Sequence, residues 1–86
     1  MEISITDRAK EDLVHWKKSG NKSIQQKISK LIESILIDPF GGLGKPEPLK
    51  YELTGTWSRR INKEHRLVYE VAENKIIILS MRGHYD

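Results

Sequence analysis

Three side chains in this sequence could together carry out acid–base chemistry on a phosphate ester: Glu47, Arg66 and His84. Glu47 lies between Pro46 and Pro48, whose rings restrict the backbone on either side and hold the carboxylate in a defined direction. An ordinary glutamate is ionised at pH 7 and can accept a proton, whereas a histidine near neutrality can donate one. With a guanidinium that grips two phosphate oxygens, these groups would suffice for metal-free cleavage of RNA through its 2′-hydroxyl.

Further cations surround these three groups along the chain. Between residues 45 and 66 there are six Lys or Arg residues against three Glu, a distribution that suits a phosphate backbone but also an ordinary solvated sheet surface. The candidate substrate-binding residues are Lys50, Arg59, Arg60 and Tyr85. Tyr85 could stack on a base or simply pack. Taken one at a time, Glu47 is also compatible with an exposed loop residue, and His84 with a frayed tail.

The other aromatic and imidazole side chains are expected to be structural. His15 falls on a predicted helix, and His65 points to the sheet face opposite Arg66. Trp16 and Trp57 are expected to anchor the packing of a small core rather than to bind bases.

Two helices are predicted in the first half of the chain. A short strand over residues 2–6 comes first, and Thr6 can cap the helix that follows, which ends at Gly20. Ser23 and Gln26 could form a capping box for the second helix, and Pro39 stops it. Apolar residues one helical turn apart predict the buried stripe of that helix, namely Ile24, Ile28, Leu31, Ile32, Ile35 and Leu36.

The second half of the chain is predicted to form strands. Residues 40–48 are rich in glycine and proline and indicate a loop. Strands over residues 56–61, 65–72 and 75–82 follow, joined by short turns as in an antiparallel meander. The predicted fold class is therefore α+β, with an N-terminal strand and two helices packed on one face of an antiparallel sheet that the meander completes.

Alternation along the middle strand divides its side chains between the two sheet faces. Leu67, Tyr69 and Val71 are the more apolar set and should face the helices. Arg66 would then point to the open face, where it could meet a ligand.

Length and composition limit the alternatives. A chain of 86 residues has room for one domain, residues 1–86. The absence of cysteine excludes disulfides and a thiolate nucleophile or metal ligand. No apolar run approaches the roughly 18 residues that a membrane span needs, and no secretory signal is apparent, which favours the cytoplasm. The Gly-rich run at residues 41–44 follows a helix rather than a strand, so it is a poor phosphate loop, and neither a metal nor another cofactor is expected.

Several motifs closely resemble the YoeB/Txe toxins of the RelE superfamily. They are Asp38-Pro39-Phe40, Gly44-Lys45-Pro46-Glu47-Pro48-Leu49-Lys50, Leu53-Thr54-Gly55-Thr56-Trp57-Ser58-Arg59-Arg60-Ile61, Glu64-His65-Arg66-Leu67-Val68-Tyr69 and Arg82-Gly83-His84-Tyr85. The resemblance implies a RelE-like fold, with Glu47 as the general base, Arg66 as the phosphate ligand and His84 as the general acid. It implies supporting roles for Lys50, Arg60 and Tyr85. Asp86 departs from the pattern, which usually ends at the His-Tyr pair.

The resemblance also implies an activity and partners. These toxins cleave mRNA in the A site of the ribosome, and a YefM-type antitoxin blocks them and represses their operon together with them. A homodimer is expected, with operator DNA bound only through the antitoxin complex and no membrane involved. Two alternatives stay open: a non-catalytic module of the same fold that acts on another target such as DNA gyrase, and a transcriptional accessory without toxicity.

Overall fold

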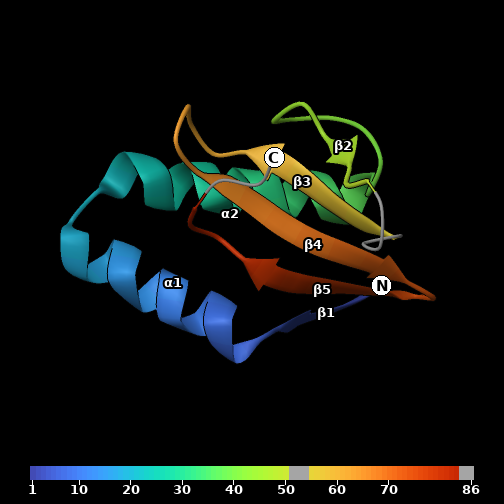
Figure 1. Ribbon diagram of the computed structural model, residues 1–86, viewed down its shortest axis with the longest axis horizontal. Coiled ribbons are helices and arrows are strands. Elements are labelled where there is room, and N and C mark those ends of the chain that lie inside the picture. The colour runs from blue at the N-terminus through green and yellow to red at the C-terminus, as the bar shows by residue number, and fades with distance from the viewer. Residues whose placement is uncertain (51–54, 84–86) are drawn as a thin grey trace.

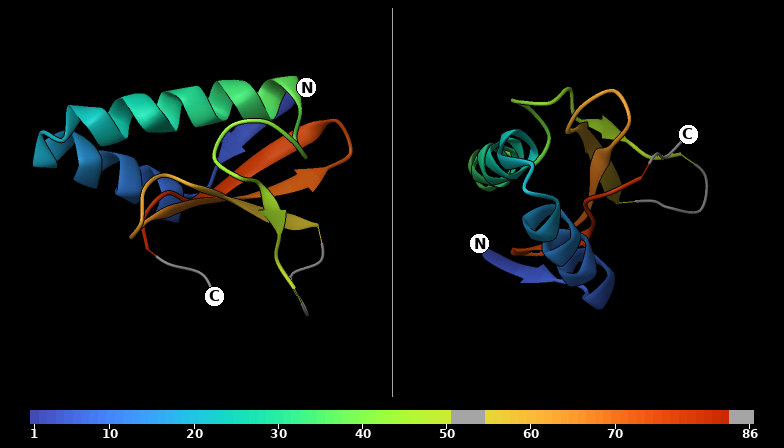
Figure 2. Two further views of the ribbon diagram at one scale, coloured as in Figure 1. Left: turned by 90° about the horizontal axis from the view of Figure 1, so that it is seen from above. Right: turned by 90° about the vertical axis from the view of Figure 1, so that its left-hand side faces the viewer.

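The computed structural model describes residues 1–50 and 55–83, and within them two helices cover one face of a five-stranded sheet (Figure 1). The view from above in Figure 2 shows both helices on the same side of the strands. In chain order the elements are β1 (Glu2–Ile5), α1 (Asp7–Ser19), α2 (Lys22–Ile37), β2 (Glu47–Pro48), β3 (Thr56–Arg60), β4 (Arg66–Ala72) and β5 (Lys75–Ser80). None of the helices in the described ranges is long and apolar enough to cross a membrane.

The helix boundaries follow from capping side chains. Thr6 caps α1 as predicted, because its hydroxyl accepts a hydrogen bond from the backbone N–H of Ala9 at 3.1 Å. Gly20 ends α1 in the left-handed conformation, also as predicted. The predicted capping box of Ser23 is wrong, because α2 begins earlier: Asn21 is its cap and its Oδ1 accepts from the N–H of Ile24.

The sheet has the strand order β1-β5-β4-β3-β2. The predicted meander is confirmed, since β3, β4 and β5 pair antiparallel in sequence. β1 pairs parallel with β5, so the sheet is mixed rather than wholly antiparallel. Within the predicted loop, residues 47 and 48 form β2, which pairs antiparallel with β3. The short strand matters because it fixes Glu47 at the edge of the sheet.

The hydrophobic core lies between the helices and the sheet. The stripe of α2 supplies Leu31 and Ile35, both fully buried, whereas Leu36, which was predicted to belong to it, is 42% exposed because it lies in the last turn of the helix. The middle strand β4 supplies Leu67 and Tyr69 as its alternation predicted. Val68 on the opposite face is buried too, next to an irregularity in the pairing of β4 with β5. The core therefore holds the helices on one face and leaves Ser58, Arg60 and Arg66 on the other.

The N-terminal elements are tied to the segment around Met81. The carboxylate of Asp12 accepts from the backbone N–H of Met81, and the indole of Trp16 donates to its carbonyl oxygen, each at 2.9 Å. The hydroxyl of Thr6 donates to the carbonyl oxygen of Leu79, also at 2.9 Å. The two contacts to Met81, which are buried, fix the chain beyond β5 against α1.

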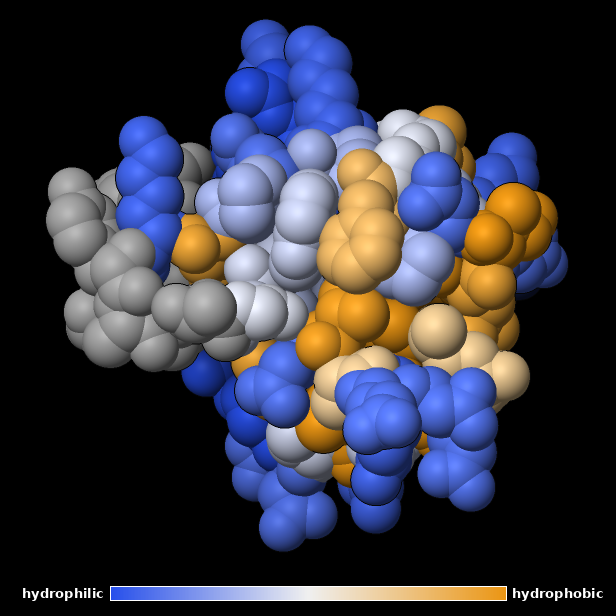
Figure 3. All heavy atoms as spheres, turned by 90° about the vertical axis from the view of Figure 1, so that its right-hand side faces the viewer, coloured by the Kyte–Doolittle hydropathy of each residue, from blue (hydrophilic) through white to orange (hydrophobic). Residues whose placement is uncertain are grey.

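Hydrophobic side chains remain at the surface on the end of the molecule where α2 finishes (Figure 3). The exposed apolar residues of this region come from the last turn of α2 and the loop after it, namely Leu36, Ile37, Phe40 and Leu43. Phe40 packs beside Trp57, with ring centroids 5.1 Å apart.

Candidate active site

Glu47 and Arg66 meet on the sheet face that the helices leave open. The Oε1 atom of Glu47 lies 2.9 Å from Nη1 of Arg66. Glu47 pairs with Ser58 across the β2–β3 ladder, and Ser58 pairs with Val68 across the β3–β4 ladder. Arg66 lies two residues from Val68 and therefore on the same face, so its side chain reaches diagonally past β3 to the carboxylate.

The pair combines an accessible carboxylate with a partly enclosed cation. The side chain of Glu47 is 58% exposed and that of Arg66 only 12%. A ligand from solvent can therefore reach the carboxylate, while the guanidinium is held by its surroundings. This arrangement suits a base that takes a proton from a ligand, next to a cation that binds its phosphate.

Ser58 holds Arg66 in place and was not among the predicted site residues. Its hydroxyl accepts a hydrogen bond from Nη1 of Arg66 at 3.2 Å, and Ser58 is 1% exposed. Alternation along β3 puts Ser58 and Arg60 on one face. The register of β3 against β4, which no local pattern encodes, places Ser58 next to the side chain of Arg66.

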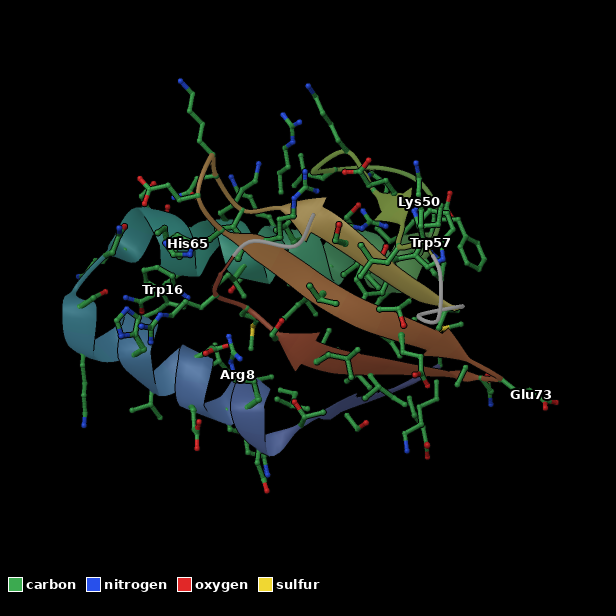
Figure 4. The ribbon with its side chains drawn as sticks, in the orientation of Figure 1. Arg8, Trp16, Lys50, Trp57, His65 and Glu73 are labelled. Atoms are coloured by element: carbon green, nitrogen blue, oxygen red, sulfur yellow. The ribbon has the colours of Figure 1, made fainter. Side chains whose placement is uncertain are left out.

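Two of the predicted substrate-binding cations lie at the surface near this pair. Arg60 is directly opposite Arg66 in the β3–β4 ladder and is exposed. Lys50 is exposed just after β2, where Leu49 still donates a backbone hydrogen bond to Thr56. Figure 4 shows Lys50 in the region of β2.

The predicted substrate-binding role of Arg59 is wrong, because this residue is fully buried. Its Nε donates to the hydroxyl of Tyr69, Nη1 to the hydroxyl of Ser34, and the two Nη atoms to three loop carbonyl oxygens at 2.7–2.9 Å. The loop carbonyls belong to Asp38, Gly41 and Leu43. A guanidinium has five N–H donors, and all five are used. Arg59 therefore fastens the loop after α2 and has no donor left for a substrate phosphate.

Tyr69 completes this buried network. Its hydroxyl accepts from Arg59 and donates to the carbonyl oxygen of Pro39 at 2.6 Å. Burial raises the pKa of Tyr69 above its ordinary value of 10.0; the hydrogen bond and the charge of Arg59 oppose that rise, and the charge of Asp38 adds to it. The phenol is thus kept neutral in the fold.

The backbone also brings the segment after β5 next to Arg66. The carbonyl oxygen of Gly83 accepts from the N–H of Arg66 at 2.9 Å, and its own N–H donates to Nδ1 of His65 at 3.0 Å. His84, the next residue, and Tyr85 and Asp86 lie outside the described residues. Their predicted roles are therefore not tested.

The structural roles predicted for the tryptophan side chains and for His15 and His65 are confirmed. Trp16 is 5% exposed and stacks edge-on against both His15 and His65, at 4.8 Å between ring centroids in each case. Figure 4 shows His65 beside Trp16 over the helices, away from Lys50. In residues 1–50 and 55–83, no three His, Asp or Glu side chains are grouped so that they could hold a metal ion.

Comparison with known proteins shows similarity over nearly the whole chain. The sequence model of a family described as the YoeB-like toxin of bacterial type II toxin-antitoxin systems matches residues 5–85. Toxin YoeB of Synechocystis sp. is 48% identical over 86 residues, which are 100% of this chain and 99% of that protein. Toxin YoeB of Escherichia coli K12 is 44% identical, over 99% of this chain and 100% of that protein.

Solved structures agree with the sequence relatives. A YoeB/ParE toxin from Agrobacterium tumefaciens superimposes with a TM-score of 0.93 at 39% identity, over 99% of this chain and 100% of that one. A YoeB dimer from Staphylococcus aureus gives 0.89 at 44% identity, and a YoeB–YefM complex from the same organism gives 0.86 at 45% identity, each over 99% of this chain and 98% of that one.

Proposed function

The chain belongs to the family of YoeB-like toxins of bacterial type II toxin-antitoxin systems, and from this membership we propose that it is an endoribonuclease that cleaves mRNA in the ribosomal A site and stops translation. The observation that carries the proposal is the pair of Glu47 and Arg66 on the open sheet face, 2.9 Å apart. A carboxylate base and a phosphate-binding guanidinium at that separation fit the two sides of one phosphodiester. No resident cofactor is needed for this reaction.

The proposed reaction is a transesterification. Glu47 accepts the proton of the 2′-hydroxyl, whose oxygen attacks the adjacent phosphorus. The bond from phosphorus to the 5′-oxygen of the next nucleotide breaks, leaving a 2′,3′-cyclic phosphate, and His84 protonates the departing 5′-oxygen. Arg66 neutralises the charge that accumulates on the non-bridging oxygens.

Binding of RNA must exchange one partner of Arg66 for another. Nη1 now contacts both Glu47 and Ser58. A phosphate that takes the place of the carboxylate on Arg66 leaves Glu47 free to receive the 2′-proton. Lys50 and Arg60 would bind flanking phosphates, Tyr85 would stack on a base or hydrogen-bond a phosphate, and Arg59 is left out because its donors are all engaged within the fold.

Partner proteins are proposed from the relatives. Two structures from Staphylococcus aureus show a YoeB dimer and a YoeB–YefM complex. We expect this chain likewise to bind a YefM-type antitoxin that blocks its site, to form a homodimer, and to reach operator DNA only through the antitoxin complex.

Cleavage of mRNA on programmed ribosomes tests the proposal. Wild type should cut within the A-site codon and leave a 2′,3′-cyclic phosphate, and a 2′-deoxy nucleotide at the scissile position should block cleavage. Glu47→Ala, Arg66→Ala and His84→Ala should each lower the rate at least about 100-fold, whereas Glu11→Ala, at an exposed position of α1, should not. Unchanged cleavage by Glu47→Ala would refute the role of the base. Broken DNA with intact mRNA would instead favour a gyrase-directed toxin.

A further inference from the structure

A basic hollow of about 370 Å³ lies between α2, the loop before β2 and the turn from β3 to β4. Four of its lining residues are cationic, and none of those in the described chain is acidic. The lining consists of Lys27, Gly44, Lys45, Arg60, Ile61, Asn62 and Lys63. Figure 4 shows side chains with nitrogen tips projecting along this edge, from the β3–β4 turn and from the loop that leads to β2.

The cations of this hollow are not neutralised within the described part of the chain. The ion pairs found there join Arg8 to Asp12 and Arg66 to Glu47, and neither involves a residue of the hollow. Four cationic side chains that line one hollow, with no carboxylate among the lining residues, create a positive potential that attracts an anion.

Hydrogen bonds hold the backbone on two sides of the hollow. The backbone N–H of Arg60 donates to the carbonyl oxygen of Gly44 at 2.7 Å, which fastens the loop to the end of β3. Asn62 Oδ1 accepts from the N–H groups of Glu64 and His65, which fixes the opposite turn. Lys45 has a φ of 52°, in the left-handed region that lysine seldom adopts. Such strain persists only where the surroundings impose it, and it concentrates at binding sites.

The hollow continues the candidate active site. Arg60 lines it and also lies directly opposite Arg66 in the β3–β4 ladder. A strand whose scissile phosphate sits on Arg66 would therefore carry a neighbouring phosphate past Arg60 toward Lys45 and Lys63.

We propose that this hollow is a second phosphate site, which binds a backbone phosphodiester of the mRNA next to the one that is cut. The proposal rests on the proposed function and adds a subsite to it. Ribosomal RNA at the A site presents the same chemical group, so the test must separate the two sources.

The test compares two double variants. The hollow variant carries Lys45→Asn together with Lys63→Gln, and the control variant carries Lys10→Gln together with Lys18→Gln. Both remove two positive charges from exposed positions, and asparagine tolerates the left-handed backbone of residue 45. The control lysines lie on α1. Binding is measured over a range of salt concentrations, on vacant ribosomes and on ribosomes that hold an mRNA with 2′-deoxy nucleotides in the A-site codon, which cannot be cut.

A loss of binding is expected only on the ribosomes that hold mRNA. There the hollow variant should bind about tenfold more weakly than wild type, with the slope of log Kd against log salt reduced by about 0.7, the contribution of one single-strand phosphate contact. The α1 control should match wild type. An equal loss on vacant ribosomes would keep a phosphate site but assign it to ribosomal RNA, which overturns the mRNA assignment.

Another outcome rejects the site. A hollow variant that binds both kinds of ribosome like its control, and that keeps the wild-type unfolding free energy, overturns the proposal. Wild type could also show the steeper slope of log Kd against log salt only on ribosomes that hold mRNA, and yet cut no mRNA. The proposed function would then fail while the phosphate site stands.

Discussion

Glu47 and Arg66 belong to strands that are not neighbours, yet Oε1 of one lies 2.9 Å from Nη1 of the other across β3. The carboxylate is more than half exposed, so solvent screens the attraction between the two charges. Pairs of this kind usually contribute no more than about 1 kcal/mol to stability. The ion pair therefore contributes little to the stability of the fold.

The first prediction separates activity from stability at this pair. Glu47→Gln keeps the shape of the side chain but removes the base, so cleavage should fall at least about 100-fold. The unfolding free energy should change by less than about 1 kcal/mol. Single-turnover cleavage and urea denaturation measure the two effects. A variant that loses stability and activity in parallel would show that the pair is structural.

The second prediction concerns Ser58, whose hydroxyl holds Nη1 of Arg66 at 3.2 Å. Ser58→Ala leaves that guanidinium less well positioned, so the single-turnover rate should fall about tenfold at saturating ribosomes. Ser29→Ala, at an exposed position of α2, is the matched control. Equal rates for the two variants would mean that Arg66 needs no support from β3.

The third prediction concerns the buried guanidinium of Arg59. Lysine keeps the charge but has three donors in place of five, so Arg59→Lys should leave loop carbonyls unpaired and cost about 3–5 kcal/mol of unfolding free energy. Arg60→Lys, at the exposed neighbouring position, should change it by no more than about 0.5 kcal/mol. Urea denaturation of both variants is the measurement, and similar stabilities would contradict the assigned role.

Much of the fold could be predicted from the sequence, but the buried position of Arg59 could not. The stripe of α2 and the meander were predictable because both depend on local periodicity. The parallel pairing of β1 with β5 was not, because no local pattern encodes which strand becomes the neighbour of another. Alternation along β3 does place Arg59 with Trp57 on the inner face. Arg59 was nevertheless assigned to substrate binding because it is charged. The carbonyl oxygens that accept its hydrogen bonds belong to a loop distant in sequence, so no local pattern showed that the charge could be buried.

The candidate site was predictable in its residues and less so in its construction. Strand alternation supported Arg66, whereas the choice of Glu47 depended mainly on the family motifs, and the structure brings the two side chains together. Ser58 was missed because its role depends on the register of three strands. The hydrogen bond from the N–H of Gly83 to Nδ1 of His65 was missed for a similar reason, because it joins segments that only the tertiary structure brings together.

The fourth prediction follows from the raised pKa of Tyr69. The neutral phenol donates to Pro39, so Tyr69→Phe should cost about 1–2 kcal/mol of unfolding free energy at pH 8. Because the folded pKa lies above the unfolded one, the stabilisation is complete below about pH 10 and is lost as pH rises through the folded pKa. The difference between wild type and variant should therefore shrink in strongly alkaline solution. A difference that stays constant or grows between pH 8 and about pH 11 would contradict this.

The fifth prediction compares two glycines with left-handed backbones. A Cβ on Gly44 would lie 2.6 Å from Leu31 Cδ2 and 3.2 Å from the carbonyl oxygen of Arg60, whereas a Cβ on Gly20 would meet nothing within 4 Å. Both alanine variants should lose about 1–2 kcal/mol from backbone strain, and Gly44→Ala should lose about 1–3 kcal/mol more from crowding. Thermal or urea denaturation gives both values. Equal losses would show that the loop can move away from β3.

The parallel pairing of β1 with β5 sets the order in which the chain can fold. Thr6, Asp12 and Trp16 are synthesised early, but their partners at Leu79 and Met81 follow 65 to 73 residues later. Contacts so distant in sequence make folding slow, because a long loop must close before any of them forms. A nascent chain therefore has no place to dock its first strand until translation has passed β5. This toxin is in this way kept from completing its fold while it is still being synthesised.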